Sequence, residues 1–201
     1  RWAEVVFTLQ HAKSDMQAFY ADVKARVEAS GRQASNCAIL PAIDVALGET
    51  QTIAEEKAAY LGSLVNAGFG VAEISNATGS DLSGQDIDAP LSDLDLKEGA
   101  RGMLDVILQG SRAGAFTLRE AGQKYGYTRM NPLLVGTPAR VADQMQDLFE
   151  ADCCDGFILC PSLTPTGYEE FCQMVVPELQ RRGLFRVGYT GHTFRQHLEE
   201  N

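Results

Sequence analysis

The chain has 201 residues, of which 45% are hydrophobic and 22% are charged, and its formal net charge is −10. This composition is typical of a globular domain rather than a disordered chain, and its acidity argues against nucleic acid, whose phosphates require a basic surface. No run approaches the roughly 18 apolar residues of a membrane span, and residues 1–8 lack the regions of a secretory signal.

Three apolar runs predict the strands of a parallel sheet. They cover residues 4–8, 37–48 and 155–160, and the second run is apolar on both faces. Such runs fit strands that are covered on both sides, so we expect three buried strands. Three strands leave two open edges and cannot close a barrel, which indicates a missing portion or a partner that supplies it.

Segments whose apolar residues recur at helical spacing lie between these runs. Ser14 is placed to cap a helix that ends at Gly31, with Gln17 as its capping-box partner. In the triplet Gly136-Thr137-Pro138, threonine suits the cap and proline the first helical position of another helix. Further helices are expected at residues 52–65, 97–109, 117–124 and 167–182.

Two segments lack a regular periodicity of apolar residues. Residues 66–96 are rich in Gly, Asp and Ser, and a connection of this length is typical of a lid or binding loop. Residues 183–201 contain Leu184, Phe185 and Tyr189, so we expect a C-terminal arm that packs on something. Four arginines between Arg181 and Arg195 are either solvated or dock on another part of the protein or on a second subunit.

The cysteines indicate free thiols. Their number is odd and no secretory signal is visible, which favours a reducing, cytoplasmic location. Neither a second cysteine pair nor a nearby histidine gives the spacing of a zinc site, so we expect no metal. We interpret the five as small buried apolar residues: Cys37, Cys153, Cys154, Cys160 and Cys172.

Four stretches of the chain resemble a known family in the right order. Residues 135–198 resemble the C-terminal signature of the nitrilotriacetate, EDTA and dibenzothiophene-sulfone monooxygenases. Residues 3–10 and 19–32 resemble the middle of the same proteins, and residues 81–91 resemble their insertion loop. The chain is thus similar to one branch of the bacterial-luciferase-like, flavin-dependent monooxygenases.

The resemblance implies an α/β fold, namely the C-terminal portion of a TIM (β/α)8 barrel. Residues 1–201 would hold strands six to eight, with the insertion after strand seven at residues 66–96. The cofactor would be reduced FMN, supplied by a separate flavin reductase, and a small organic substrate would receive oxygen from O2. A homo-oligomer is expected, without a nucleic-acid or membrane partner.

The same resemblance implies an incomplete site. In the family, loops of earlier strands hold the flavin phosphate, and those residues are not in this sequence. We therefore expect the chain alone to be weakly active or inactive. The alternative is a catalytically inactive, truncated module that self-associates or complements a missing N-terminal half.

Active sites of TIM barrels lie at the carboxyl ends of the strands, which selects six candidate residues here. Asp44 is the one charge in an apolar run, so it either pairs with an arginine or a backbone N–H or polarises substrate. His11 is either an acid–base group or an exposed loop histidine. The candidates that face substrate or cofactor are Thr8, Gln10, His11, Asp44, Cys160 and Ser162, and none is assigned a catalytic role.

Overall fold

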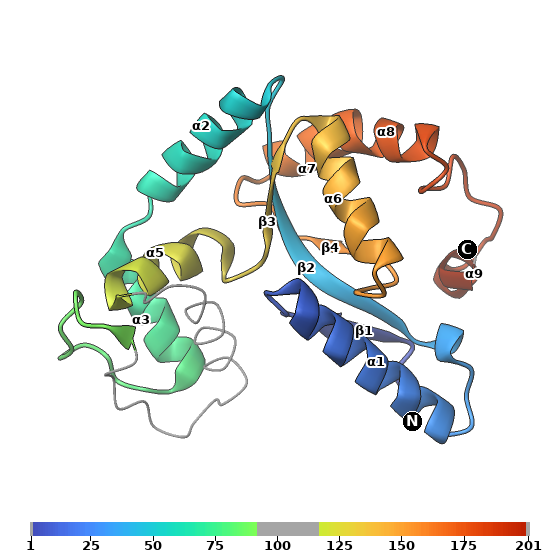
Figure 1. Ribbon diagram of the computed structural model, residues 1–201, viewed down its shortest axis with the longest axis horizontal. Helices are drawn as coiled ribbons and strands as arrows, with labels where there is room; N and C mark the ends of the chain where they lie inside the picture. The colour runs from blue at the N-terminus through green and yellow to red at the C-terminus, as the bar shows by residue number, and fades with distance from the viewer. Residues whose placement is uncertain (1, 92–116, 200–201) are drawn as a thin grey trace.

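The computed structural model describes residues 2–91 and 117–199. Its centre is a parallel sheet in which the ten-residue strand β2 (Ala38–Leu47) pairs with three shorter strands (Figure 1). Ile39, Ala42 and Ile43 of β2 are fully buried, as expected for the central strand of a sheet with an apolar sequence. The predicted α/β class with a parallel sheet is confirmed.

The shorter strands pair with successive parts of β2. β1 (Val5–Thr8) lies beside its first residues, and β4 (Ile158–Leu159) lies beside Ala42 and Ile43. β3 (Leu133–Gly136) lies beside the last part of the strand, from Asp44 to Leu47. Because all three pairings are parallel, the four strands run in the same direction.

The expectation of three buried strands is wrong in two respects. β3 is a fourth strand, and its short apolar run stands directly before a strong helix start, which hides it in the sequence. β1 and β4 are only partly buried, and Phe7 on β1 is 50% exposed. The apolar runs therefore predicted the positions of β1 and β4 correctly, but not how much of their side-chain surface is buried.

Helices connect the strands and extend beyond them. Most lie where apolar spacing predicted them, although the segments after β4 form one helical stretch with a π turn in its middle. The helical elements are α1 (Lys13–Ala29), η1 (Ala34–Asn36), α2 (Gln51–Ser63), α3 (Ala67–Thr78), α5 (Leu118–Thr128), α6 (Pro138–Glu150), α7 (Thr166–Glu170), η3 (Phe171–Val175), α8 (Val176–Arg181) and α9 (Phe194–Glu199).

Threonine side chains cap the amino ends of α2, α5 and α6. The side chain of Thr137 accepts a hydrogen bond from the Arg140 amide and Pro138 opens α6, which confirms that prediction. Thr50 caps α2 and Thr117 forms a capping box at α5. Ser14 does not cap α1, because the helix already begins at Lys13 and Ser14 lies inside its first turn.

The segment 66–96 is less irregular than its composition indicated, because it contains α3. Asn66 caps this helix and Gly79, with a φ of +68°, ends it in the left-handed region. Gly68 and Gly70, which gave no helical signal in the sequence, lie within it. The helix predicted at residues 97–109 lies outside the described residues.

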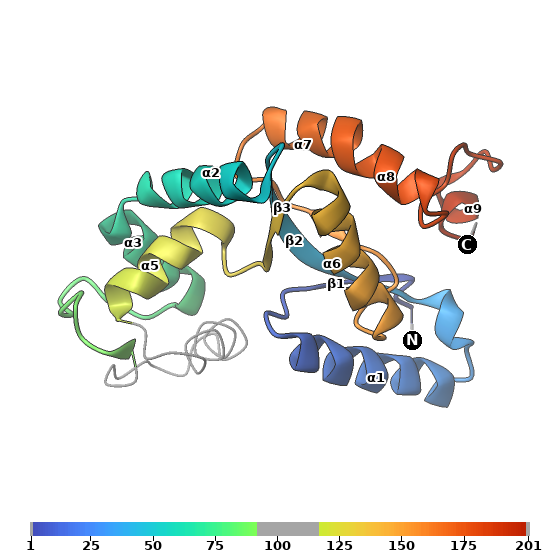
Figure 2. The same cartoon turned by 45° about the horizontal axis from the view of Figure 1, so that its top comes forward.

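α3 and α5 pack against each other through glycines. A Cβ atom added at Gly70 would lie 1.8 Å from the carbonyl oxygen of Gly122, so neither helix tolerates a larger residue at this crossing. Around this contact the two helices bury an apolar cluster that includes Ile74, Leu118 and Tyr125. The pair thus forms a unit with its own core beside the sheet (Figure 2).

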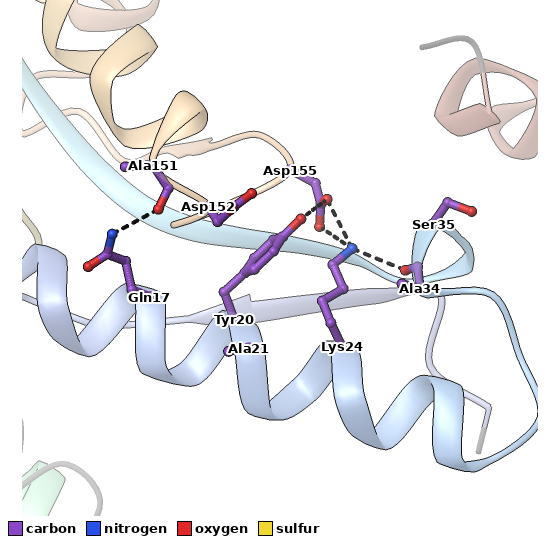
Figure 3. A pocket seen from close by; sticks show the side chains of 9 residues that line it. All are labelled: Gln17, Tyr20, Ala21, Lys24, Ala34, Ser35, Ala151, Asp152 and Asp155. Carbon is purple, nitrogen blue, oxygen red and sulfur yellow. Dashed lines mark hydrogen bonds and ion pairs between the residues drawn. The ribbon is translucent and has the colours of Figure 1, made fainter.

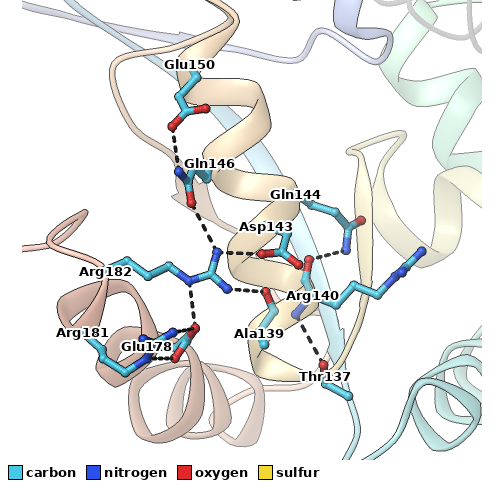
Figure 4. A network of polar contacts seen from close by, with 10 residues as sticks. All are labelled: Thr137, Ala139, Arg140, Asp143, Gln144, Gln146, Glu150, Glu178, Arg181 and Arg182. Carbon is cyan, nitrogen blue, oxygen red and sulfur yellow. Dashed lines mark hydrogen bonds and ion pairs between the residues drawn. The ribbon is translucent and has the colours of Figure 1, made fainter.

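A second apolar cluster joins the sheet to α6 and α8. It is built from Ile43 and Leu134 on the strands with Val141 and Leu179 on the helices. Arg182, at the end of α8, fastens the two helices together (Figure 4). Its guanidinium contacts Asp143 at 2.7 Å and Glu178 at 2.8 Å, so at least this part of the arginine-rich region docks on the chain itself.

The C-terminal arm makes fewer apolar contacts than its sequence indicated. Arg195 of α9 forms a 2.8 Å ion pair with Glu4 near the start of the chain. Tyr189 is 68% exposed, and Leu184 and Phe185 are also exposed. The arm therefore docks on the chain through polar groups and leaves most of its apolar side chains uncovered within the described residues.

The interpretation of the cysteines is confirmed for three of the five. Cys37, Cys153 and Cys154 are buried, Cys160 is partly buried, and Cys172 is exposed on the helical stretch after β4. All five are free thiols. In residues 2–91 and 117–199 there is no helix with the length and apolarity that crossing a bilayer requires.

The glycine contact between α3 and α5 gives a stability prediction. Gly70→Ala forces the two helices apart and should lower the free energy of unfolding by about 1 to 3 kcal/mol. Gly62→Ala, in α2, is the matched control, because its Cβ would meet only ordinary contacts at 3.5 Å. It should leave stability unchanged or raise it by up to about 1 kcal/mol. Urea unfolding followed by circular dichroism measures both, and equal effects would contradict the close packing.

Candidate functional site

Helix α5 carries two polar residues that reach the sheet where strands end. Lys124 and Tyr127 are three residues apart and therefore lie on one face of the helix. Lys124 contacts His11 after β1, and Tyr127 interacts with Ser162 after β4. The opposite face, with Leu118 and its neighbours, packs on α3. The site thus lies between the polar face of α5 and the sheet.

His11 is held from both ring nitrogens. Its Nδ1 lies 3.0 Å from the carbonyl oxygen of Met130, and its Nε2 lies 3.0 Å from Nζ of Lys124. Since the carbonyl only accepts, Nδ1–H donates to it and Nε2 accepts from the lysine ammonium, which requires a neutral imidazole. His11 does lie in the loop after β1, but it is partly buried rather than exposed.

Burial favours the neutral form of this histidine. It is the main cause that lowers the pKa of His11, and the positive charge of Lys124 lowers it further, while the hydrogen bond to Met130 opposes the change. Burial also lowers the pKa of Lys124. The His11–Lys124 contact is therefore a polar pair with less positive charge than two separate side chains would carry.

Asp44 is the buried carboxylate of the sheet, with 2% of its surface exposed. Its Oδ1 accepts hydrogen bonds from the amides of Val45, at 2.8 Å, and Ser162, at 3.3 Å. The Ser162 hydroxyl donates to Oδ2. Burial raises the pKa of Asp44 and these three hydrogen bonds oppose the rise. Of the alternatives for Asp44, the structure supports backbone N–H partners rather than an arginine.

Tyr127 was not recognised in the sequence. Burial and the nearby charge of Asp44 raise the pKa of its phenol to about 12, and a hydrogen bond with Ser162 opposes the rise. Burial and the same carboxylate raise the pKa of the Cys160 thiol. The spacing of Lys124 and Tyr127 on a helix was the available signal, but it indicates a site only once α5 is known to face the strand ends.

The predicted candidates thus fall into two neighbouring groups. Asp44, Cys160 and Ser162 come together, whereas His11 lies with Lys124. The link from α5 to β3 joins the groups, because its Met130 carbonyl binds His11 and its Pro132 carbonyl accepts from the Asp44 amide at 2.9 Å. Thr8 is buried at the end of β1 beside Pro41, and Gln10 is partly buried; a functional role for either stays a prediction.

The backbone of this link between α5 and β3 has an unusual conformation. Arg129 and Met130 both have positive φ values, of 52° and 66°, which residues with a side chain rarely adopt. Met130 and Asn131 are nevertheless buried, at 1% and 5% exposure. Hydrogen bonds to His11 and to Asp44 therefore fix a strained connection between α5 and the sheet.

A pocket at the other end of β2 has a different character (Figure 3). It measures about 680 Å³ and is lined by Tyr20, Lys24 and Asp155 among others. Asp155 accepts from the Tyr20 hydroxyl at 2.9 Å and from the Ile39 amide at 2.7 Å, and it pairs with Lys24 at 2.8 Å. Because this network satisfies its own charges at the amino end of the sheet, we interpret it as a structural clamp.

Neither group of candidates resembles a metal centre. Across the described ranges, His, Cys, Asp and Glu side chains do not gather in threes at metal-binding distance. What the site offers is a neutral imidazole, a hydroxyl, a phenol and a buried carboxylate, which are groups that orient ligands and hold or move protons.

Known proteins match nearly the whole chain. Dibenzothiophene-sulfone monooxygenase of Rhodococcus erythropolis is 38% identical in an alignment of 203 positions, which covers 98% of this chain and 45% of that protein. Nitrilotriacetate monooxygenase component A of Aminobacter aminovorans is 38% identical over 98% of this chain and 44% of that protein. The chain is therefore similar, over nearly its whole length, to one part of the luciferase-like flavin-dependent monooxygenases. It spans less than half the length of these relatives, and no protein-family model matches it.

Solved structures of luciferase-like proteins share the fold. The crystal structure of DmoA from Hyphomicrobium sulfonivorans superposes with a TM-score of 0.86 and 27% identity, covering 98% of this chain and 41% of that one. A riboflavin lyase, crystallised with modified FMN and riboflavin, has a TM-score of 0.79 and 26% identity over 98% of this chain and 43% of that one. The arrangement of strands and helices is therefore that of the family.

The His11–Lys124 pair gives a titration prediction for this luciferase-like chain. Lys124→Met removes one cause of the lowered pKa, so the pKa of His11 should rise, yet stay below 6.5 because burial remains. In the unaltered protein the unfolded chain takes up the proton first, so stability should fall as the pH drops below about 6.5. Histidine NMR measures the titration. Arg119→Met, on the same helix but paired with Asp88 at the surface, is the control and should leave the pKa of His11 unchanged.

Proposed function

We propose that this chain is the substrate-side and lid portion of an FMNH2-dependent, two-component monooxygenase. The full protein would insert one oxygen atom from O2 into a small organic substrate beside a C–N or C–S bond. The observation that carries this proposal is the similarity over 98% of the chain to a sulfone monooxygenase and to a nitrilotriacetate monooxygenase component. The second relative is one component of a monooxygenase, which supports a separate flavin reductase as the partner of this chain.

In this proposal the sheet is part of a TIM barrel, and its four strands are one more than the predicted strands six to eight. Segment 66–96, which contains α3 and follows α2, serves as the insertion. Packed on α5, it would cover the ends of the strands and exclude water from the reaction. Such exclusion of water would suit the oxygen chemistry that FMN supplies when bound.

The residues at the strand ends fit one end of the cofactor. Neutral hydrogen-bonding groups such as His11, Ser162 and Tyr127 suit the polar atoms of a flavin ring or of a substrate. We do not assign the phosphate to them, because a phosphate is bound best by several backbone amides or by arginine. When bound, FMN would supply the oxygen chemistry, while this chain orients the substrate and shields the site.

The incomplete phosphate site predicts weak activity of the chain by itself. Titration with FMN, followed by quenching of flavin fluorescence, should give millimolar rather than micromolar affinity. Adding a flavin reductase, NADH and a sulfone substrate should give no product above the reaction without the chain. Micromolar binding together with turnover would contradict the proposal that other residues complete the site.

The alternative is a non-catalytic module that associates with itself. Its support is the partly exposed strand β1, with Phe7 uncovered, next to an arm whose aromatic residues face outward. Analytical ultracentrifugation separates the two proposals. A stable, monodisperse dimer favours the module, whereas aggregation that is relieved by a complementary N-terminal segment of a relative favours the incomplete barrel.

A further inference from the structure

The unit formed by α3 and α5 has its own core and lies beside the sheet (Figure 1). The chain enters this unit through residues 64–66, which follow α2, and leaves it through residues 129–132, which precede β3. The two links lie close together, because a Cβ atom added at Gly126, near the end of α5, would lie 2.5 Å from Val65 of the first link. A body with its own core on two neighbouring links can turn about them without unfolding.

Met130 is placed at the pivot of such a movement. Its side chain belongs to the apolar core of the unit, whereas its carbonyl oxygen lies 3.0 Å from Nδ1 of His11, outside the unit. Two residues further on, the Pro132 carbonyl accepts from the amide of Asp44 in β2. The link after α5 is therefore bound to the sheet side, and α5, which precedes the link, is the part that can move.

One imidazole contacts both the pivot and the moving helix. Nδ1–H of His11 donates to the Met130 carbonyl, and Nε2 accepts from Nζ of Lys124 on α5, at 3.0 Å. Protonation of His11 adds a proton at Nε2 and leaves Nδ1–H as it is. The bond to Met130 therefore survives. Nε2–H and the lysine ammonium, in contrast, are two donors of like charge, so their contact is lost.

We propose that His11 is a pH-sensitive latch: its protonation breaks the contact with Lys124, and the α3–α5 unit then turns away from the sheet about the link at Met130. Loss of the proton restores the acceptor on Nε2, and the unit closes again. The movement uncovers the ends of the strands that α5 faces. That this uncovering admits a substrate or a flavin rests on the proposed function, whereas the latch itself does not.

The surroundings of His11 determine the pH at which the latch opens. Burial lowers the pKa of His11 and the bond to Met130 raises it, while the charge of Lys124 on α5 lowers it and that of Asp15 on α1 raises it. Among the described residues, Lys124 and Asp15 are the charged groups that act on this imidazole. The net change is downward from 6.5, so the latch is closed at neutral pH and opens in acid.

The movement is measured with two spin labels, without flavin or substrate. Gln123→Cys on α5 and Ala25→Cys on α1, both exposed, carry the labels in a chain whose accessible thiols are removed by Cys160→Ser and Cys172→Ser. Pulsed electron–electron double resonance gives the distance distribution above and below the midpoint of the His11 titration, which NMR measures. Below the midpoint the distribution should gain a longer component.

Three substitutions and a second label pair separate the latch from other effects of acid. His11→Gln has no imidazole to protonate and Lys124→Met leaves no ammonium opposite it, so each should abolish the response to pH. Arg119→Met removes a cation of α5 that pairs at the surface and should keep the response. Labels at Ala25→Cys and Ala139→Cys lie outside the unit, on α1 and α6, and should give one distance at both pH values.

A permanent charge tests the latch at neutral pH, where acid unfolding has no part. His11→Lys places a second ammonium opposite Lys124 and should give the longer component at neutral pH. Adding Lys124→Glu places opposite charges there and should restore the shorter distance. If His11→Gln does not fold, Lys124→Met still decides, because it leaves His11 in place.

Three results would overturn the latch. One is a wild-type distance that stays the same while His11 titrates, and another is a response to pH that persists in Lys124→Met. The third is a His11→Lys chain that keeps the shorter distance at neutral pH. Flavin and substrate take no part in these measurements, so the latch and the proposed function fail separately.

Discussion

The need to accommodate the Asp44 carboxylate inside an apolar strand constrains the structure around it. A carboxylate without partners in a protein interior is costly, so β2 is compatible with Asp44 only if other groups approach it. Ser162 approaches from the end of β4 with an amide and a hydroxyl. The position of the loop after β4 is therefore coupled to the middle of β2, and Tyr127 reaches the same serine from α5.

α5 transmits this constraint to the rest of the chain, because its two faces have different partners. One face closes on α3 through Gly122 so tightly that a Cβ at Gly70 does not fit. The other carries Lys124 and Tyr127 toward the sheet. A movement of the α3–α5 unit would therefore break contacts to His11 and Ser162 together. If this unit is a lid, as we propose, closing the lid would form these polar contacts and opening it would break them.

The sequence predicted the parts of the fold that depend on local pattern. The apolar run of β2 and the cap at Thr137 each follow from neighbouring residues, and both are confirmed. β3 was missed because four apolar residues before a helix give no periodic signal. α3 was missed because Gly68 and Gly70 lower helix propensity, and only their packing against α5, distant in sequence, explains them.

The site was predicted from the sequence in part, for a similar reason. Asp44 stood out as a charge in an apolar run, and the rule that barrel sites lie at strand ends selected Ser162, Cys160 and His11. Asp44, Ser162 and Cys160 do come together. Lys124 and Tyr127 did not stand out, because a lysine and a tyrosine on an amphipathic helix are ordinary surface residues until the tertiary structure turns that face toward the strands.

Burial shifts the pKa values of His11 and Asp44 in opposite directions but with the same effect on charge. It lowers the pKa of His11 and raises that of Asp44, so each group is driven toward its neutral form. A chain with a net charge of −10 thus arranges a site of weak charge at its strand ends. Neutral groups contact other molecules through hydrogen bonds, and a phenol such as that of Tyr127 can both donate and accept them.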